Sequence, residues 1–316
     1  MLPPSVAVDS SSCASLSSAT CSPSSALRCG PGAASCSPAL FLEVFSGAGD
    51  LTKAIARVKV DCLEPQDYSS GGVDFSNCRE VEELWEVWRS RACGGNRLFF
   101  HFAPPCNTFS RARDRSVKTR LRSSSRPAGL YPEHPATKLA NLVADNTLRS
   151  IKFLVEELGA QGTLEQPAGS YLASYFDLVE WLGLETTSTT LHQCRYGRPY
   201  KKPTTFWYFG GLHLRTLARK CENMSCGRSF HVELGFGKTS TSPAAAYSPA
   251  LCAAYAAGLK KHIVDTEVAQ DSSRKRLRLT TSGKVRRHVD RGCSDPSRRE
   301  ARAAEDAGSR AGHHRS

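Results

Sequence analysis

ALFLEVFSGAGD, residues 39 to 50, joins an apolar run to a turn that contains two glycines. The run 39–45 predicts a buried β-strand, and 50–58 predicts a helix directly after the turn. Gly47 and Gly49 would let a ligand approach the backbone, and a helix N-terminus favours polar or anionic groups. Because tight strand-to-helix turns also use glycine for steric reasons, this turn alone is weak evidence for a ligand site.

Strand and helix signals continue to alternate along the chain as far as residue 264. Further strands are predicted at 60–64, 97–103, 163–164, 187–192 and 204–209, and helices at 79–92, 137–158, 175–184 and 249–262. The apolar face of the helix 79–92 is formed by Val81, Leu84, Val87 and Trp88. Such alternation predicts an α/β fold, with a mostly parallel sheet covered by helices on both faces.

The segments that flank the middle region, 39–264, differ from it in composition. Residues 1–38 are rich in Ser, Ala and Pro and predict a disordered leader, and 265–316 predict a disordered basic tail. No apolar run approaches the roughly 20 residues of a membrane span. Thirteen cysteines without a secretory-signal pattern favour a reduced intracellular protein over a secreted disulfide scaffold.

The net charge of +12 is concentrated in two segments. Residues 111–126 hold seven Lys/Arg and one acid, and 274–316 hold thirteen Lys/Arg and five acids, which leaves the rest at −2. Neutralisation of phosphates by Lys/Arg is the main source of sequence-independent affinity for nucleic acids, so a nucleic-acid partner is expected and a membrane partner is not. The stretch 274–278 is also a weak nuclear-import signal.

HFAPPCNTFSRAR, residues 101 to 113, places Cys106 at the exit of a predicted strand and just before the basic segment. A small buried hydrophobe, the alternative interpretation of this cysteine, needs neither neighbour. A nucleophile that acts on a polyanion benefits from both, since nearby cationic groups lower the pKa of a thiol. The sequence therefore favours Cys106 as a nucleophile with a lowered pKa.

Two acids follow the glycine turn in the order that a nucleotide-like ligand requires. Glu64 in DCLEPQD ends the second predicted strand, where a carboxylate can accept hydrogen bonds from ribose hydroxyls. Asp74 in GGVDFSN stands at the expected position of a third strand, within reach of an adenine amino group. Either acid alone is more often a solvated loop residue. Together with the glycine turn they favour a cofactor that contains adenosine.

In this order the motifs resemble those of the C5 cytosine methyltransferases. FSGAG (45–49) resembles the first cofactor motif of that family, and APPCNTFS (103–110) its catalytic Pro-Cys loop. LEQP (164–167) resembles the Glu-Asn-Val motif, CRYGRPYKKPTTFW (194–207) a later motif, and YSPALCAAYAAGL (247–259) the closing helix. The resemblance covers nearly all of 40–262 and implies a Rossmann-like methyltransferase domain.

The resemblance implies S-adenosylmethionine as the cofactor and a cytosine in DNA as the substrate. The cofactor-binding residues that it implies are Phe45, Gly47, Gly49, Glu64, Asp74 and Pro105. Cys106 would add to C6 of the base and so activate C5 for methylation. Glu165 would bind N3 and the exocyclic amine, and Lys202 would keep one charge of the later motif.

A base must leave the duplex to reach such a pocket, and basic residues of 111–126 are expected to close over its phosphates. These nucleic-acid-binding candidates are Arg111, Arg113, Arg115, Lys118, Arg120 and Arg122.

The chain departs from the family pattern at several positions. Tyr200, Lys202 and Thr204 stand where Gln, Arg and Arg are usual, and lysine lacks the bidentate fork of arginine. Gln166 and Pro167 replace Asn and Val. Only about forty residues separate the last predicted strand from the closing helix, which is short for a target-recognition region. RNA as the substrate, and an inactive nucleic-acid-binding module that keeps the fold, therefore stay open. An amino-group methyltransferase ranks lower, because that class has an aromatic residue at the position of Cys106.

The short insert, residues 210–246, contains Cys221, Cys226 and His231, with His213 upstream. A compact insert with little core can be stabilised by zinc. The spacing C-x4-C-x4-H matches no common zinc finger, so the sequence favours ordinary packed residues here and no metal site.

Overall fold

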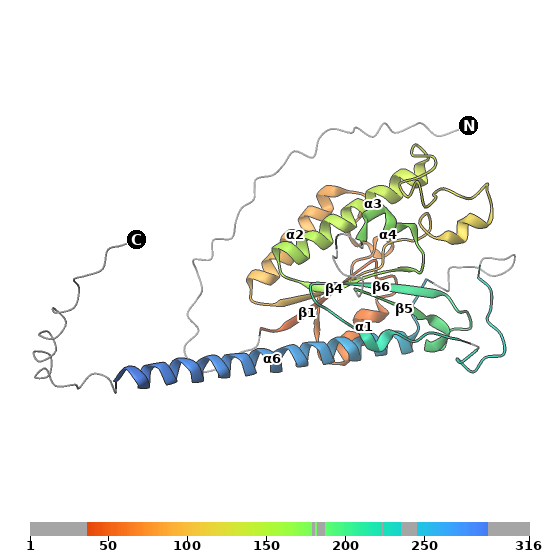
Figure 1. Cartoon of the computed structure of the whole chain (residues 1–316). Coiled ribbons are helices and arrows are strands. Elements are labelled where there is room, and N and C mark those ends of the chain that lie inside the picture. Colours follow the sequence, from red (N-terminus) through yellow and green to blue (C-terminus); the bar gives the residue numbers. More distant parts are fainter. Residues whose placement is uncertain (1–36, 179–180, 182–186, 223, 235–244, 290–316) are drawn as a thin grey trace, which may run out of the picture. The chain divides into compact units, whose positions relative to one another are not determined.

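A six-stranded sheet forms the centre of the computed structural model, which describes residues 37–178, 181, 187–222, 224–234 and 245–289. Its strands are β1 (Ala39–Val44), β2 (Asp61–Cys62), β3 (Arg97–Phe102), β4 (Gln161–Pro167), β5 (Ser188–His192) and β6 (Pro203–Phe209), in the order β2-β1-β3-β4-β6-β5 (Figure 1). Strands β2, β1, β3 and β4 are parallel, and β6 is antiparallel to both β4 and β5. The mixed α/β fold with a mostly parallel sheet is therefore confirmed.

The pairing of β1 with β3 is central to this sheet. The two strands are parallel along their whole length, from Ala39 opposite Arg97 to Val44 opposite Phe102. On its other side β1 pairs with β2, so the order of strands reverses between β1 and β3. At such a reversal the loops after the two strands diverge and leave a crevice at the carboxyl ends.

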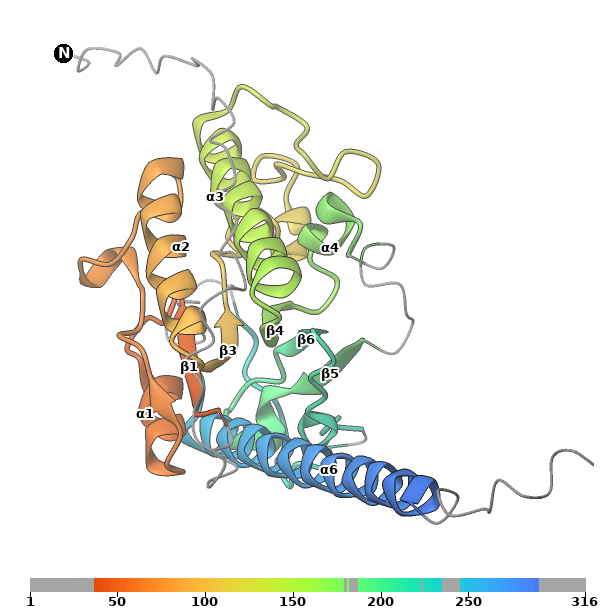
Figure 2. The same cartoon turned by 90° about the vertical axis from the view of Figure 1, so that its left-hand side faces the viewer.

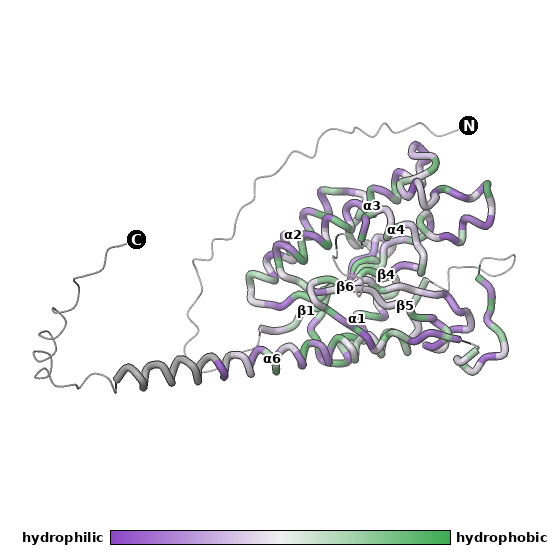
Figure 3. The backbone as a smooth tube through the Cα atoms, in the orientation of Figure 1, coloured by the Kyte–Doolittle hydropathy of each residue, from purple (hydrophilic) through white to green (hydrophobic). Residues whose placement is uncertain are grey.

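Helices cover both faces of the sheet (Figure 2). On one face lie α2 (Cys78–Cys93), α3 (Pro135–Lys152) and α4 (Tyr171–Phe176), and on the other α1 (Asp50–Arg57) and α6 (Pro249–Val289). Side chains alternate between the faces along each strand. Leu40 and Leu42 thus pack with α2 and α3, whereas Phe41 packs with α1 and α6. Figure 3 shows the apolar residues of the strands gathered between these helices.

Helix α2 confirms the helix predicted at 79–92, but one of the four side chains assigned to its buried face is exposed. Val81, Leu84 and Trp88 are buried, but Val87 is 47% exposed, so its assignment to the buried face was wrong. Val87 follows Val81 by six residues, which places it about 120° around the helix from it at 3.6 residues per turn.

Other element boundaries differ from the predicted ones. Helix α3 is followed by a π turn, Phe153–Glu157, and the strand expected at 163–164 is the longer β4. Of the helix expected over 175–184, Leu178 and Trp181 are helical, and Trp181 N donates to Asp177 O at 3.0 Å. Its first two residues belong to a separate helix, α4, which begins at Tyr171 because the Ser170 side chain accepts a hydrogen bond from Leu172 N. It ends at Asp177, which has a positive φ of 48°. Most of the remaining expected helix lies outside the described residues.

Helix α6 was predicted to end at residue 262, with disorder from residue 265. The structure instead continues the helix to Val289. The sequence from 263 to 289 contains no proline and a single glycine, and the (i, i+4) ion pairs Lys261–Asp265 and Lys275–Asp271 favour a helix. The leader 1–36 and residues 290–316 lie outside the described residues. None of the described helices has both the length and the apolar character needed to cross a membrane.

The close contact between β3 and β4 gives a first testable prediction. A Cβ atom at Gly162 would clash with the ring of Phe100, which is fully buried and has no room to move. We expect Gly162→Ala to lower the free energy of unfolding by about 1–3 kcal/mol, as overpacked cores do. Urea denaturation measures this change. Gly94→Ala, at the exposed end of α2, serves as the control and should stay within about 0.5 kcal/mol; equal effects of the two variants would contradict the prediction.

Candidate active site

A pocket of about 790 Å³ opens where β1 and β3 end. Its walls are the loops after these strands, the segment between β2 and α2, the end of β4 and the chain before α6. The residues that line it and that the sequence had singled out are Phe45, Gly47, Asp74, Pro105, Cys106, Glu165 and Lys202. All three predicted catalytic residues therefore line one pocket at the strand-order reversal.

Gly49 and Glu64 do not line this pocket. They line a neighbouring depression of about 530 Å³ together with Lys53. The acid after β2 that reaches the main pocket is Asp67, which the sequence analysis did not assign. The sequence predicted that this strand ends at Glu64, but β2 ends at Cys62 and the chain then turns. The carboxylate that reaches the pocket is therefore three residues later than expected.

Asp67 organises the glycine turn. Its carboxylate accepts hydrogen bonds from Gly47 N, at 2.8 Å, and from Ser69 N, at 3.0 Å. Partial burial alone would raise the pKa of Asp67, but the hydrogen bonds from Ser69 and Gly47 outweigh it and hold this pKa below its ordinary value. Gly47 has a left-handed φ of 55°, with open space where a side chain would stand. The turn thus exposes backbone to the pocket beside a carboxylate that stays ionised.

Asp74 lies in a loop rather than in the third strand that was expected. Its side chain accepts hydrogen bonds from the Ser76 backbone N and hydroxyl, both at 2.8 Å, and Asn77 then caps α2. These local bonds favour a turn over an extended strand. Phe75, next to Asp74, packs against the ring of Phe45 with centroids 4.8 Å apart, which gives this wall of the pocket an apolar surface.

The loop that carries Cys106 is fixed by the end of β4. Gln166, which is buried, donates a hydrogen bond of 2.7 Å from Nε2 to the carbonyl oxygen of Pro104. Ser170 donates in turn to Oε1 of Gln166. The glutamine that departs from the family pattern therefore positions the Pro-Pro-Cys loop.

Glu165 precedes Gln166 and is buried at the floor of the pocket. Its Oε1 atom is enclosed by protein and has no hydrogen-bond partner. Burial raises the pKa of this carboxyl group, and the charge of Lys202 opposes the change only in part. A buried acceptor without a partner costs about 1–3 kcal/mol, so this oxygen is placed to bind something that enters the pocket.

The expectation of a lowered pKa for Cys106 was wrong. Burial raises the pKa of this thiol, the neighbouring Glu165 raises it further, and only Lys202 among nearby side chains lowers it. The charges that shift the pKa of Cys106 are those of Glu165 and Lys202, and the arginines of 111–126 are not among them. Several of these arginines instead contact other parts of the protein.

Arg122 shows this most clearly. It is 1% exposed and its guanidinium lies 3.6 Å from the centre of the Phe109 ring. It donates hydrogen bonds to Thr108 Oγ1 and to the carbonyl oxygen of Pro127. The prediction that Arg122 contacts phosphates is contradicted by this burial.

The other five basic residues that were predicted to bind nucleic acid divide into two groups. Arg113 and Arg120 are half-buried and donate to backbone carbonyl oxygens, Arg113 to Thr119 at 2.9 Å and Arg120 to Asp114 at 3.0 Å. They hold the loop in shape. Arg111, Arg115 and Lys118 are exposed on the surface, where a polyanion can reach them.

A buried hydrogen-bond network supports the pocket from the side of α6. His101 on β3 is hydrogen-bonded to Thr163 Oγ1 at 2.7 Å and to the hydroxyl of Tyr247 at 3.0 Å. Thr163 also contacts the hydroxyl of Tyr255 at 2.8 Å. Burial lowers the pKa of His101 to about 3, so the ring stays neutral. This network holds Tyr247, which lines the pocket. Nothing in the sequence around His101 indicated this role.

Lys202 belongs to a strained loop between η4 (Gln193–Tyr196) and β6. Its φ is 27°, a conformation rarely adopted by residues other than glycine. Gln193 N donates to the carbonyl oxygen of Lys201 at 2.8 Å, and Arg198 donates to that of Tyr247 at 2.7 Å. Strain of this kind collects at functional sites, where surrounding contacts enforce it.

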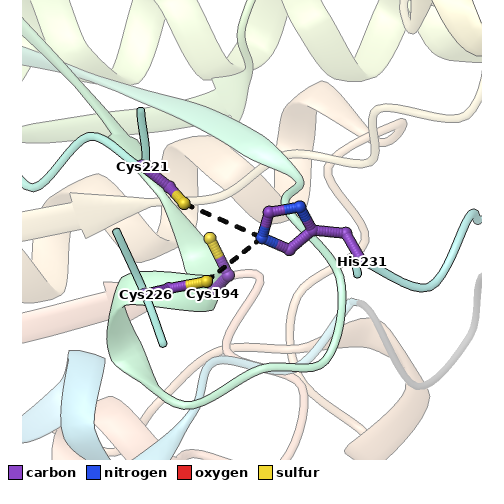
Figure 4. Close-up of side chains that lie close together, drawn as sticks. All are labelled: Cys194, Cys221, Cys226 and His231. Carbon is purple, nitrogen blue, oxygen red and sulfur yellow. Dashed lines mark hydrogen bonds between the residues drawn. The ribbon is translucent and has the colours of Figure 1, made fainter. Parts of the chain in front are cut away.

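Outside the pocket, the fold brings together residues that sequence spacing had not favoured as a metal site. Cys221, Cys226 and His231 lie with Cys194 in one cluster (Figure 4). His213 is not part of it and packs against the ring of Tyr208 instead.

Neither a protein-family model nor a curated protein matches this chain.

Glu43 gives a prediction about pH. It is buried beside the pocket, and burial raises its pKa to about 7, although hydrogen bonds from Thr52 oppose this. Because the folded state binds this proton more tightly than the unfolded chain, the free energy of unfolding should fall as the pH rises from about 4.5 to about 7. The shift corresponds to about 3 kcal/mol.

Glu43→Gln should remove this contribution and make the protein more stable than wild type at pH 8 but not at pH 4.5. Urea denaturation at both pH values measures it, with Glu156→Gln, the same change at an exposed glutamate that does not line the pocket, as the control. Parallel pH profiles for wild type and Glu43→Gln would refute the assignment.

Proposed function

We propose that this protein is an S-adenosylmethionine-dependent methyltransferase that modifies C5 of cytosine in DNA, with a single Rossmann-like methyltransferase domain. The observation that carries the proposal is the buried Glu165 oxygen without a partner, in the same pocket as the Cys106 thiol. Cytosine offers a ring nitrogen and an amino group to such a carboxyl group and an electrophilic C6 to such a sulfur.

The donor set of the pocket fits S-adenosylmethionine. Asp67 and Asp74 offer carboxylates for hydroxyl and amino groups, and Phe45 and Phe75 offer an apolar surface for a purine ring. Gly47 leaves open space for a close approach to its backbone. When bound, S-adenosylmethionine supplies an electrophilic methyl group on a sulfonium.

Chemistry on the base is assigned to three side chains. The Cys106 thiol loses its proton to solvent, and the ammonium of Lys202 favours the thiolate that results. The sulfur then forms a bond to C6 while Glu165, whose raised pKa keeps a proton available, protonates N3. The product is an enamine that is nucleophilic at C5. After methylation, C5 loses its hydrogen as a proton to solvent, the C5–C6 double bond re-forms as Cys106 leaves as a thiolate, and N3 returns its proton to Glu165.

The exposed residues Arg111, Arg115 and Lys118 are proposed to contact phosphates around a base that has left the duplex. The basic stretch 274–278 supports a nuclear location. RNA is the alternative substrate, and the tests below include it.

Covalent trapping tests the chemistry. A substrate with 5-fluorocytosine should form an adduct that survives denaturing gels in the presence of S-adenosylmethionine, because fluorine cannot leave C5 as a proton would. Mass spectrometry should map the adduct to Cys106. Cys106→Ala should abolish trapping, and Glu165→Gln should slow it by about 10²–10⁴-fold.

Cys93→Ala, at an exposed cysteine on α2, is the matched control and should trap like wild type. If wild type binds the cofactor and both nucleic acids but never forms an adduct with DNA or RNA, the nucleophile assignment fails. The protein would then be a binding module without this chemistry.

A salt titration tests the nucleic-acid surface. Arg115→Ala combined with Lys118→Ala should weaken binding to duplex DNA of any sequence and reduce the slope of log K against log salt by about 0.9 for each lost phosphate contact. Arg79→Ala, an exposed arginine on α2, should leave the slope unchanged. Arg122→Ala should lower stability instead, since this side chain is buried. An unaltered slope in the double variant would move the phosphate contacts to another surface.

A further inference from the structure

Four potential metal ligands meet outside the pocket. They are the sulfurs of Cys194, Cys221 and Cys226 and a ring nitrogen of His231, and all four atoms lie within 4.8 Å of one another. Nε2 of His231 is 3.8 Å from Sγ of Cys221 and 3.3 Å from Sγ of Cys226 (Figure 4). We infer that these residues bind one structural Zn²⁺ ion.

The two distances from His231 Nε2 to the cysteine sulfurs, 3.8 and 3.3 Å, are close to those between ligands of tetrahedral zinc. With Zn–S bonds of about 2.3 Å and Zn–N bonds of about 2.0–2.1 Å, tetrahedral ligands lie about 3.5–3.8 Å apart. A disulfide would use two of the sulfurs and leave a thiol and an imidazole facing it. An iron–sulfur cluster places several irons and sulfides between its thiolates and needs a wider spacing. Calcium and magnesium prefer oxygen ligands.

The backbone presents the ligands from three separate segments. Cys194 lies in η4, Cys221 follows η5 (Arg215–Leu217), and Cys226 and His231 lie in the loop that comes next. A turn between the two later cysteines is closed by hydrogen bonds from Ser225 N to Glu222 O and from Gly227 N to Met224 O. The turn sets both thiols on the same side as Cys194.

Hydrogen bonds rather than apolar packing hold this loop to the protein, among them those from Val232 N to Pro199 O at 2.9 Å and from Arg228 to Gly197 O at 2.8 Å. Met224 is 41% exposed and Phe230 is 68% exposed, so the loop has few apolar side chains in the core. Cys194 and Cys221, by contrast, are buried. A segment with so little core of its own is the usual setting for a structural metal ion. Four protein ligands also leave no open coordination position, which excludes a catalytic role for the ion.

The metal would fix one wall of the active-site pocket. Cys194 immediately precedes the loop that contains Arg198 and Lys202, and Tyr196 next to it is hydrogen-bonded to Leu217 O at 3.0 Å. Zinc would therefore join this loop to the insert that follows β6. The inference does not depend on methyl transfer, because the site holds the fold whatever the pocket does.

Elemental analysis of the full-length protein, purified under reducing conditions with zinc supplied, tests the inference. We expect about one zinc ion per chain. Substituting Co²⁺ should give the visible absorption of a tetrahedral site together with a thiolate charge-transfer band. Cys226→Ser and His231→Ala should lose the metal, whereas His231→Cys should retain it.

Cys93→Ser and His213→Ala alter metal-type residues outside the cluster and are the matched controls that should keep full occupancy. Because a variant can fail to fold, the wild-type protein is also treated with a chelator. The melting temperature should fall, and the cluster thiols should become reactive. Wild type that binds neither zinc nor cobalt, full occupancy in His231→Ala, or a disulfide within the cluster in the reduced protein would each overturn the inference.

Discussion

The parallel pairing of β1 with β3 is the constraint on which the site depends. It joins strands that are more than fifty residues apart in the chain and sets their carboxyl ends side by side. The glycine turn and the Pro-Pro-Cys loop leave from these two ends, and both are pinned, the first by Asp67 and the second by Gln166. The crevice between them is thus a product of backbone hydrogen bonding, and the chemistry of its walls can vary without loss of the fold.

Two adjacent residues of strand β4, Glu165 and Gln166, have different roles in the pocket. The Gln166 amide donates to Pro104 O and accepts a hydrogen bond from Ser170, while the adjacent Glu165 keeps one buried oxygen without a partner. The unpartnered oxygen of Glu165 therefore lowers the stability of the fold, whereas the hydrogen bonds of Gln166 fix the geometry of the loop. The raised pKa of both Glu165 and Cys106 favours the protonated forms of these two groups, and the charge of Lys202 opposes both shifts.

Apolar periods in the sequence could predict most of the strands and the glycine turn, and they placed Cys106 directly after a strand. Glu165 and Lys202 were expected only from the family resemblance. Sequence patterns could not predict which charged side chains are buried and which are exposed. Arg122 counts as one positive charge in a basic segment, yet its contact with Phe109 depends on tertiary packing. The Cys194 thiol joins the metal-type cluster across 27 residues of sequence, a proximity that only the fold creates. For the same reason Asp67, and not Glu64, reaches the pocket.

Helix α6 has a consequence for how the protein would move along a nucleic acid. Arg97, at the amino end of the central strand β3, pairs with Glu267, and from there the helix continues for 22 residues to Val289, about 33 Å at 1.5 Å per residue (Figure 1). This arm has seven Lys/Arg and no acid between 274 and 289. Its length is close to the roughly 34–36 Å of one turn of duplex DNA. If the protein acts on DNA as proposed, a helix of that length and sequence charge would keep the protein near the phosphates while the pocket is empty, and the search for a cytosine would then proceed by sliding rather than by repeated dissociation.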